Sequence, residues 1–585
     1  MDILWSISTT IRNPDRIPGF FMCLSKIRGE IWNNATQVKF QSMLIQDRLY
    51  TPTNEGLSSY QINILNDASI EMTYEQANNI FNSKNYTDPP MRGRTSFDPI
   101  EKMGLVNIVD NRIKLSQIGE MYLENRIDFG EVILNAFLKW QYPNPLTSGL
   151  ADYNTKPFIN TLRVIKLVNE ICEERGLKSK GISREEFGIF VLSLKRYESC
   201  IAVANLILEF RQAKDSIQDD TEKKEFVKRY ILEYLNNYQD PLRNTIEYSD
   251  NMIRCLRLTK FIYVRGNGYY IDLEPRRKVE IESLLNYDNG SSLVFTKDNW
   301  IEYMGSINSY ILPWESNSKL IEIQESLISE IADIQQRLNI RRELNLNNSN
   351  DNQTLKENIS ELRNYRTELQ TKLIRVEYHK VENIDNTILQ LSDIRSLRNK
   401  PSIELERLAN LSMNILNDAI SIKPNYPVGD DNEPTFTAPS KVPDIECFYE
   451  DFNTICEVTM LTSLNQWFNE GQPVMRHLRE FQILNNDKPA YCLFIAPKLH
   501  QDTLNTFWNA VKYEYQGEKQ RIIPITITQL MQILEKVKEL KQSNKYLKST
   551  ILKDLFDECI DVNKHKDSHA WKQFIDNRID SWSVR

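Results

Sequence analysis

Asp444 and Glu457 are spaced as two carboxylates that could bind one metal ion. Residues 443–460 read PDIECFYEDFNTICEVTM, so Asp444 follows a proline and Glu457 interrupts an apolar run typical of a strand. Strand interiors are depleted in Glu, and an unpaired buried carboxylate is costly, so a cationic partner or a metal is expected beside it. Because adjacent strands lie about 4.8 Å apart, both carboxylates could reach one hard divalent cation such as Mg²⁺. Such a cation would neutralise a phosphodiester and lower the pKa of a water molecule.

This pair of carboxylates is a weak signal on its own, because a turn-ending Asp and an arginine-paired Glu would give the same string. Three residues add context: Glu406 on an expected helix upstream, and Glu470 and His477 downstream. Seven residues separate Glu470 from His477, which is close to two helical turns, so these side chains could project together. A helix-borne Glu, the PD…E pair and a following core strand are the layout of the PD-(D/E)xK nuclease fold.

The elements that must position these residues follow an α/β pattern from about residue 395. Helices are expected at 403–419 and from Pro473, where a first-turn proline fits, and strands at 445–449 and 452–459. The continuous apolar run AYCLFIAP predicts a central strand covered on both faces. The segment RIIPITITQ predicts another strand before a helix capped by Thr528, and the chain from 545 is expected to be mostly helical. We therefore predict a C-terminal α/β domain over residues 395–585.

Residues 1–290 read as helices punctuated by two short hairpins. The first has strands at 105–109 and 113–115 around an Asp110–Asn111 turn, then a helix opened by Ser116. The second has a helix with Ser249 as N-cap, then strands at 261–264 and 269–273 around a Gly-Asn-Gly turn. A helix followed by a two-stranded wing, found twice, outlines a winged helix, although generic α+β structure explains the pattern equally well. Helices of that class read base edges in the major groove of DNA.

Residues 318–384 carry apolar residues in a seven- and three/four-residue rhythm, with a polar break at 345–353. This pattern predicts an antiparallel helical hairpin with a coiled-coil seam. We expect residues 291–394 to form a helical linker that holds the two halves of the protein apart. The expected fold class is therefore a multidomain protein with a mainly helical N-terminal region, a helical linker and a C-terminal α/β domain.

The composition bounds the class of protein. The 585 residues exceed one core, and the net charge of −8 argues against coating of nucleic acid without regard to sequence. This net charge is compatible with basic side chains gathered in one cleft. No apolar run is long enough to predict a transmembrane helix, and the N-terminus does not resemble a signal peptide. The eight cysteines form no CxxC pair, which predicts reduced thiols in a cytoplasmic protein.

Six strings carry a resemblance to a known family: STTIRNPDRIPGF, LKWQYPNP, PDIECFYEDFNTICEVT, EGQPVMRHL, YCLFIAP and RIIPITITQ. They span nearly the whole chain, and in them the sequence resembles the AlwI-like family of type IIS restriction endonucleases. That family includes strand-specific nicking enzymes and the large subunits of heterodimeric type IIS enzymes. The resemblance implies an N-terminal recognition region with winged-helix-like elements, a helical linker and a C-terminal PD-(D/E)xK cleavage domain.

The resemblance also implies roles for the acidic residues. Asp444 and Glu457 would bind Mg²⁺, with the backbone carbonyl of Val458 as a further ligand. Glu406, Glu470 and His477 match other active-site positions, although Glu404 lies only two residues from Glu406.

One residue departs from the wider superfamily. Thr459 stands where the usual ExK element has a lysine, so a second metal, His477 or a nearby lysine would have to supply the missing positive charge. Arg476 and Arg479 follow on the same expected helix and could contact phosphate, although solvated charge is the more common role of such residues.

Arginines of the recognition region are candidates for DNA contact, because arginine is the usual bidentate reader of guanine and also the commonest phosphate contact. They cluster in three segments, and the candidates are Arg12, Arg16, Arg92, Arg94, Arg254, Arg257 and Arg265.

The function expected from these observations is a Mg²⁺-dependent, sequence-specific endonuclease acting on double-stranded DNA. It would recognise a short asymmetric site and cut a few base pairs outside it. One PD…E centre per chain predicts nicking by the monomer, with a transient homodimer or a small catalytic subunit needed for the second strand. The alternatives are a winged-helix DNA-binding regulator with a decayed nuclease domain, a nuclease acting on RNA or structured DNA, and a coiled-coil scaffold.

Overall fold

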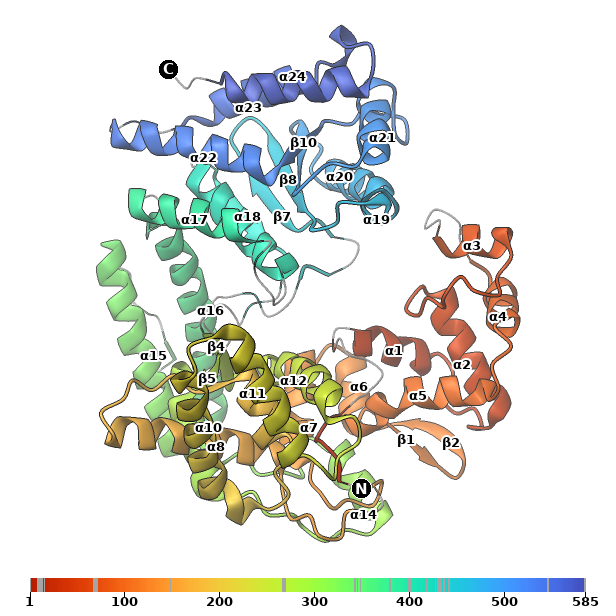
Figure 1. The fold of residues 1–585 in the computed structure, drawn as a ribbon, viewed down its shortest axis with the longest axis vertical. Coiled ribbons are helices and arrows are strands. Elements are labelled where there is room, and N and C mark those ends of the chain that lie inside the picture. The colour runs from red at the N-terminus through yellow and green to blue at the C-terminus, as the bar shows by residue number, and fades with distance from the viewer. Residues whose placement is uncertain are drawn as a thin grey trace. The chain divides into compact units, whose positions relative to one another are not determined.

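The computed structural model describes the chain except residues 1, 8–13, 15, 67–71, 148, 266–269, 341–343, 345, 348, 378–379, 395, 397–400, 417–418, 427, 429–433, 435–436, 440–441, 544, 546 and 583–585. The chain divides into two compact units, Met1–Leu320 and Ile321–Arg585 (Figure 1). Within the described ranges, no helix is long and apolar enough to cross a membrane.

The N-terminal unit is mainly helical. Its helices are α1 (Arg16–Ser25), α2 (Asn34–Gln46), α3 (Ser59–Asn66), α4 (Tyr74–Ser83), α5 (Pro89–Lys102), α6 (Gln117–Leu123), α7 (Phe129–Lys139), α8 (Pro157–Glu174), α9 (Arg184–Glu186), α10 (Cys200–Ser216), α11 (Asp220–Tyr234), α12 (Pro241–Leu258), α13 (Lys278–Tyr287) and α14 (Lys297–Gly305), with short η1 (Phe187–Val191), η2 (Tyr197–Ser199), η3 (Pro275–Arg277) and η4 (Pro313–Glu315). Its strands are β1 (Val106–Val109), β2 (Arg112–Leu115), β3 (Ile182–Ser183), β4 (Ile262–Arg265) and β5 (Tyr270–Leu273).

The first predicted hairpin is confirmed in detail. Strands β1 and β2 pair antiparallel, with Val109 opposite Arg112. The two turn residues, Asp110 and Asn111, have φ of +52° and +57°, a left-handed conformation that Asp and Asn tolerate better than most residues. Ser116 then caps α6 by accepting a hydrogen bond from the N–H of Gly119.

The second predicted hairpin is partly correct. Strands β4 and β5 pair antiparallel, and β3 adds to the other edge of β5; the Gly-Asn-Gly turn lies outside the described residues. Ser249 is not an N-cap, because α12 begins eight residues earlier at Pro241. The Ser249 hydroxyl instead donates to the carbonyl of Thr245 within the helix. Proline at the first turn is the start signal that outweighed the serine.

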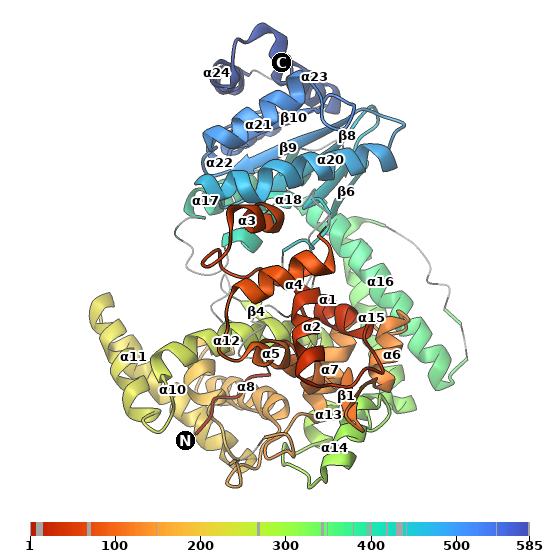
Figure 2. The same ribbon diagram turned by 90° about the vertical axis from the view of Figure 1, so that its right-hand side faces the viewer.

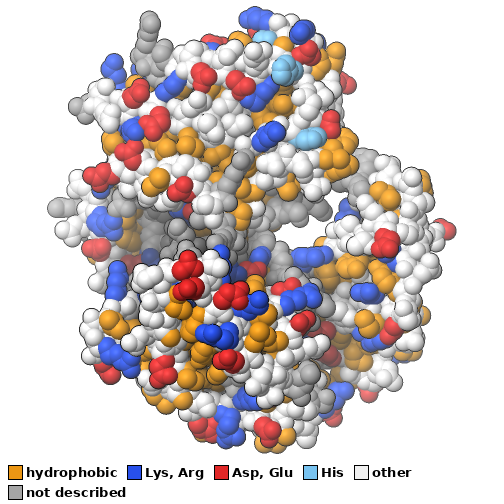
Figure 3. Space-filling view, viewed as in Figure 1, with side chains coloured by type: hydrophobic (Ala, Val, Ile, Leu, Met, Phe, Trp, Pro, Cys, Tyr) orange, Lys and Arg blue, Asp and Glu red, His pale blue; other side chains and the backbone are white. Residues whose placement is uncertain are grey.

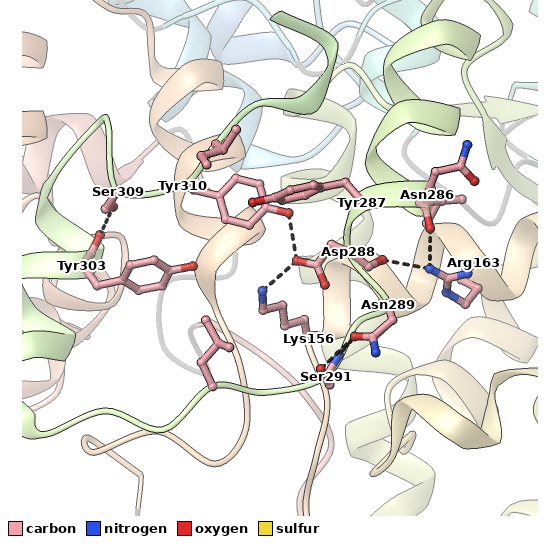
Figure 4. Close-up of a pocket in the computed structure, with 13 residues that line it drawn as sticks. Lys156, Arg163, Asn286, Tyr287, Asp288, Asn289, Ser291, Tyr303, Ser309 and Tyr310 are labelled. Atoms are coloured by element: carbon pink, nitrogen blue, oxygen red, sulfur yellow. Dashed lines mark hydrogen bonds and ion pairs between the residues drawn. The ribbon is translucent and has the colours of Figure 1, made fainter. Parts of the chain in front are cut away.

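A buried ion pair joins α8 to the segment after α13 (Figure 4). Lys156 Nζ lies 2.7 Å from Asp288 Oδ2, and the two side chains are only 5% and 7% exposed. The Tyr310 hydroxyl donates to the same carboxylate oxygen at 2.8 Å, and Arg163 donates to the backbone carbonyl of Asp288. The pair forms the wall of a pocket of about 560 Å³, and it fixes the end of α13 against α8.

The C-terminal unit begins near the start of α15. Its helices are α15 (Asn317–Leu338), α16 (Asn352–Glu377), α17 (Val381–Asp393), α18 (Pro401–Leu416), α19 (Leu464–Gln466), α20 (Gln472–Leu484), α21 (Gln501–Lys512), α22 (Ile527–Gln542), α23 (Ser549–Cys559) and α24 (Ser568–Asp580), with short η5 (Trp467–Gly471) and η6 (Val562–Lys564). Its strands are β6 (Ser421–Pro424), β7 (Ile445–Phe448), β8 (Asn453–Val458), β9 (Ala490–Ala496) and β10 (Ile522–Thr526).

Helices α15 and α16 lie side by side, but they run parallel, so the prediction of an antiparallel hairpin is wrong (Figures 1 and 2). Early residues meet early residues, as in the 3.1 Å hydrogen bond from Asn358 to Gln324, and later ones meet later ones, as in Arg366 with Glu330 at 3.3 Å. The thirteen residues between the helices can span roughly 43 Å when extended, more than the roughly 33 Å length of α15. The polar break is therefore long enough to return to the start of the first helix.

The C-terminal unit is built on a mixed sheet. Among the described residues the strand order is β10-β9-β8-β7-β6, with β10, β9 and β8 parallel and β7 and β6 antiparallel to their neighbours. Helices α17, α18 and α22 cover one face, and α20 and α21 cover the other (Figure 1). Every residue of β9 is buried, which confirms the predicted strand that is covered on both faces.

Several predicted bounds in this unit need correction. The helix expected at 403–419 is α18, which ends at Leu416, and β6 was not predicted. The cap of α22 is Thr526 and not Thr528, because Thr526 forms a reciprocal capping box with Gln529. The helix expected from Pro473 begins at Gln472, and the five-residue π-helical segment η5 comes immediately before it.

Candidate active site

Strand register brings Asp444 and Glu457 to the same edge of the sheet. Ile445 pairs with Cys456, so Asp444, just before β7, lies opposite Glu457 in β8. The Asp444 carboxylate accepts a hydrogen bond from the N–H of Val458 at 2.8 Å. This bond ties the start of β7 to the end of β8 and orients the Asp444 carboxylate beside that of Glu457.

Glu406 reaches the same place from α18. Its side chain is buried, with 5% of its surface exposed, and it accepts a hydrogen bond from the N–H of Ala438 at 2.8 Å. Glu404, the neighbouring candidate, instead pairs with Arg407 at 2.5 Å. The structure therefore separates the two glutamates, and Glu406 is the one that faces the other carboxylates.

Glu470 and His477 come from the helical segment on the opposite face of the sheet (Figure 2). Glu470 lies in η5, where the wider π-helical turn adds a residue to the helix, a feature often found at functional sites. Its carboxylate is hydrogen-bonded to the Thr459 side chain. His477 lies in α20, and its Nδ1 is 2.9 Å from Oε1 of Glu457.

The pKa values of all four carboxyl groups are raised. Burial is the largest cause in each case, and the charges of other acidic groups in the set add to it for Glu406, Asp444 and Glu457. The pKa of Glu406 rises to about 9 and that of Glu470 to about 7, while the pKa values of Asp444 and Glu457 rise well above the usual range. Every pair among the four repels, so a full set of negative charges here requires added positive charge.

Protein side chains supply little of that positive charge. Within the described ranges, none of the four carboxylates forms an ion pair with a lysine or arginine, and His477 is the partner of Glu457. Burial and the charge of Arg476 lower the pKa of His477 to about 4, so the imidazole is neutral near pH 7. Its Nε2 is buried and, within the part of the chain that the structure describes, has no hydrogen-bond partner.

The donor set is acidic and open. In the described part of the chain, no group of three or more His, Cys, Asp and Glu side chains is arranged so that it could hold a metal ion by itself. Carboxylate oxygens are nevertheless the ligands that hard divalent cations prefer, and Mg²⁺ commonly takes only one or two of them, with water and phosphate as the rest. The cluster of Glu406, Asp444, Glu457 and Glu470, which we call the carboxylate cluster, can therefore attract a cation without enclosing it.

A buried glutamine supports the cluster and was missed by sequence reasoning. Gln466 is fully buried, and its Nε2 donates to the carbonyls of Leu461 and Lys498 at 2.6 and 2.9 Å. Its Oε1 accepts from the N–H of His500 at 2.7 Å. These bonds hold the segments after β8 and β9 together, immediately before η5. A single Gln in a polar segment carries no sequence signal for this role.

The arginines predicted to contact DNA are placed in varied surroundings. Arg12 lies outside the described residues, as does the side chain of Arg265 at the end of β4. Arg94 pairs with Asp88 at 2.7 Å, and Arg254 pairs with Asp250 at 2.8 Å. Arg92 lies 4.5 Å from the ring centre of Tyr86, and Arg16 donates to the carbonyl of Leu49. Arg257 lies in the last turn of α12. On the face drawn in Figure 3, acidic and basic side chains are interspersed.

Comparison with known proteins identifies the family. A model of the AlwI restriction endonuclease family matches residues 101–533, which include β7, β8 and the whole carboxylate cluster. No match was found among curated protein sequences.

Two solved structures are similar in part. The small subunit (R.BspD6I2) of the heterodimeric restriction endonuclease R.BspD6I is 21% identical over 33% of this chain and 98% of its own, with a TM-score of 0.29. The BpuJ1 endonuclease binding domain, solved with pyrene- and phenanthrene-modified DNA, is 14% identical over 52% of this chain and 96% of its own, with a TM-score of 0.33. At these scores the likenesses add nothing to the family match, and by that match the chain belongs to the AlwI restriction endonuclease family.

Proposed function

We propose that the protein is a type IIS endonuclease that recognises a short asymmetric site in double-stranded DNA and cleaves a few base pairs outside it. One observation carries the proposal: strand register and two helices bring Asp444, Glu457, Glu406, Glu470 and His477 together in a chain of this family. Recognition is assigned to residues 1–290, cleavage to 395–585, and the offset between them to the linker 291–394.

The carboxylate cluster fits Mg²⁺. Asp444 and Glu457 would hold the ion, with the carbonyl of Val458 beside them and with water and a DNA phosphate oxygen as further ligands. When bound, Mg²⁺ supplies positive charge to the scissile phosphate and lowers the pKa of the attacking water. The mutual repulsion of the four carboxylates supports this assignment, because a divalent cation removes it.

The chain's own residues act on the proton and on orientation. With Glu457 ionised, the Nδ1–H of His477 donates to it, which leaves the buried Nε2 as an acceptor for a proton. The hydrogen bond between Thr459 and Glu470 orients the Glu470 carboxylate. Glu406 and Glu470 add negative charge on the cation side of the site.

Recognition is assigned to the elements around the two hairpins, β1–β2 and β4–β5, which we propose act as winged-helix-like modules on duplex DNA. Arg16, Arg92, Arg94, Arg254 and Arg257 are the described candidates for contacts there. Arg92 and Arg94 are exposed, but Arg94 is held by Asp88 and Arg254 by Asp250, so Arg92 is better placed than these two to contact DNA without rearrangement.

The sequence has one PD…E centre, which supports nicking by the monomer. A single centre can hydrolyse one phosphodiester of the duplex at a time, so the second strand needs another centre. A transient homodimer or a small catalytic subunit would supply it, and the two differ in how cleavage depends on enzyme concentration.

The test is a supercoiled plasmid assay with Mg²⁺ or with EDTA, followed by sequencing across the breaks. We expect Mg²⁺-dependent open circles with breaks on one strand at a fixed distance from one short motif. Glu457→Gln should lower the rate at least 100-fold while its affinity for the motif is kept, and Glu404→Gln, which alters an acid that pairs with Arg407, should cleave normally.

Each other outcome has a definite reading. Both strands cut at one rate regardless of enzyme concentration would contradict nicking by the monomer. Binding to a specific motif without any metal-dependent break would make the protein a DNA-binding regulator. Equal cleavage by wild type and Glu457→Gln would remove Glu457 from the active site.

A further inference from the structure

The carboxylate cluster lacks a positive side chain at the position where its superfamily has one. Thr459 follows Glu457 by two residues, and its hydroxyl bonds to Glu470 and accepts from the N–H of Leu461 at 3.2 Å. His477 is committed to Glu457 through Nδ1. Neither residue can therefore present a lasting positive charge to a phosphate.

Among the described residues, Arg476 is a cation near this cluster without a hydrogen-bond or ion-pair partner. It lies in α20 directly before His477, and its side chain is half-buried. Its charge reaches Glu457, whose pKa it lowers. Yet among the described residues Arg476 makes no hydrogen bond or ion pair, even with Glu480, which lies one helical turn further along.

Nearby arginines in the same unit behave differently. Arg479, three residues further along α20, forms an ion pair with Glu518, and Arg407 in α18 pairs with Glu404. Arginines near carboxylates normally form such ion pairs, since the guanidinium presents five donors in a planar fork. The unpaired state of Arg476 is therefore the exception, and it occurs at the cluster where an anionic substrate would bind.

We propose that Arg476 contacts the scissile phosphate and takes the place of the lysine that Thr459 replaces; this rests on the proposed function. A guanidinium matches two phosphate oxygens at once and stays charged at all relevant pH values. Its half-buried position excludes part of the solvent, which strengthens its effect on the charge that develops at phosphorus. Arg476 would thus stabilise the transition state from the side of the sheet covered by α20.

The test compares Arg476→Ala, Arg476→Lys and the matched control Arg479→Ala in the full chain, on a plasmid carrying the cleaved motif, with Mg²⁺. We expect Arg476→Ala to lower kcat by about 100-fold, with KM changed only a few-fold, because the contact matters most in the transition state. Added guanidinium should restore part of that loss. Arg476→Lys should fall between the two, and Arg479→Ala should keep the wild-type kcat.

The outcomes separate this inference from the function on which it rests. A wild-type kcat for Arg476→Ala would overturn the inference while leaving the endonuclease intact. Loss of cleavage that guanidinium does not restore, equal in the Ala and Lys variants and accompanied by a lower Tm, would also overturn it, because it would show a structural role. A wild-type protein that cuts no DNA would overturn the proposed function and the inference together.

Discussion

Replacing Glu470 by glutamine should stabilise the metal-free protein at pH 8 and not at pH 4.5. Burial raises the pKa of Glu470 from 4.5 to about 7, against the lowering effect of its hydrogen bond with Thr459, so the folded state holds a proton that the unfolded state has lost between these pH values. Stability therefore falls as pH rises from about 4.5 to 7. Each pKa unit is worth about 1.4 kcal/mol, so this group costs about 3 kcal/mol above pH 7. Glutamine removes that cost.

Calorimetry in EDTA at pH 8 and pH 4.5 would measure the difference on the transition of the C-terminal unit. For a domain of this size, 3 kcal/mol corresponds to an increase in Tm of roughly 6–12 °C, which should vanish at pH 4.5. The control is Glu404→Gln, which removes the ion pair with Arg407 and should leave Tm unchanged or slightly lower. An unchanged Tm for Glu470→Gln at pH 8, or an equal gain at both pH values, would refute the reasoning.

Two further predictions concern the N-terminal unit. Burial lowers the pKa of Lys139 to about 7, so the unfolded state binds more protons between about pH 7 and 10.5 and stability rises with pH there; Lys139→Met should abolish that rise in calorimetric scans. Asp288→Asn should destabilise the unit by about 3–5 kcal/mol, because it leaves Lys156 buried without its anion. A double variant that also carries Lys156→Met should recover much of that loss in urea titrations; no recovery would contradict the ion-pair argument.

The sequence predicted the parts of the site that local pattern controls. An apolar, strand-like run located the strands of the Asp444–Glu457 pair, and the β1–β2 hairpin was predicted because Asp110 and Asn111 suit a turn. The parallel course of α15 and α16 was not predictable, since heptad spacing is the same for parallel and antiparallel helices. The connection between the two helices is also long enough for either direction. The π-helical turn at Glu470 and the hydrogen bonds of Gln466 depend on contacts between distant segments, which leave no periodic signal in the sequence.

Glu457, an acidic residue in a strand of the buried sheet, marked the position of the site in the sequence. Glu457 lies in a strand whose neighbours are buried and apolar, and consistent sequences avoid such conflicts unless function requires them. The structure adds three further carboxylates around it and no lysine or arginine ion pair within the described residues. An acidic cluster of this kind repels the phosphates of DNA as well as itself. Positive charge from a cation and from Arg476 would relieve both repulsions, so we expect metal binding and DNA binding to favour each other at this site, as linkage requires when each ligand removes a cost that the other would otherwise meet.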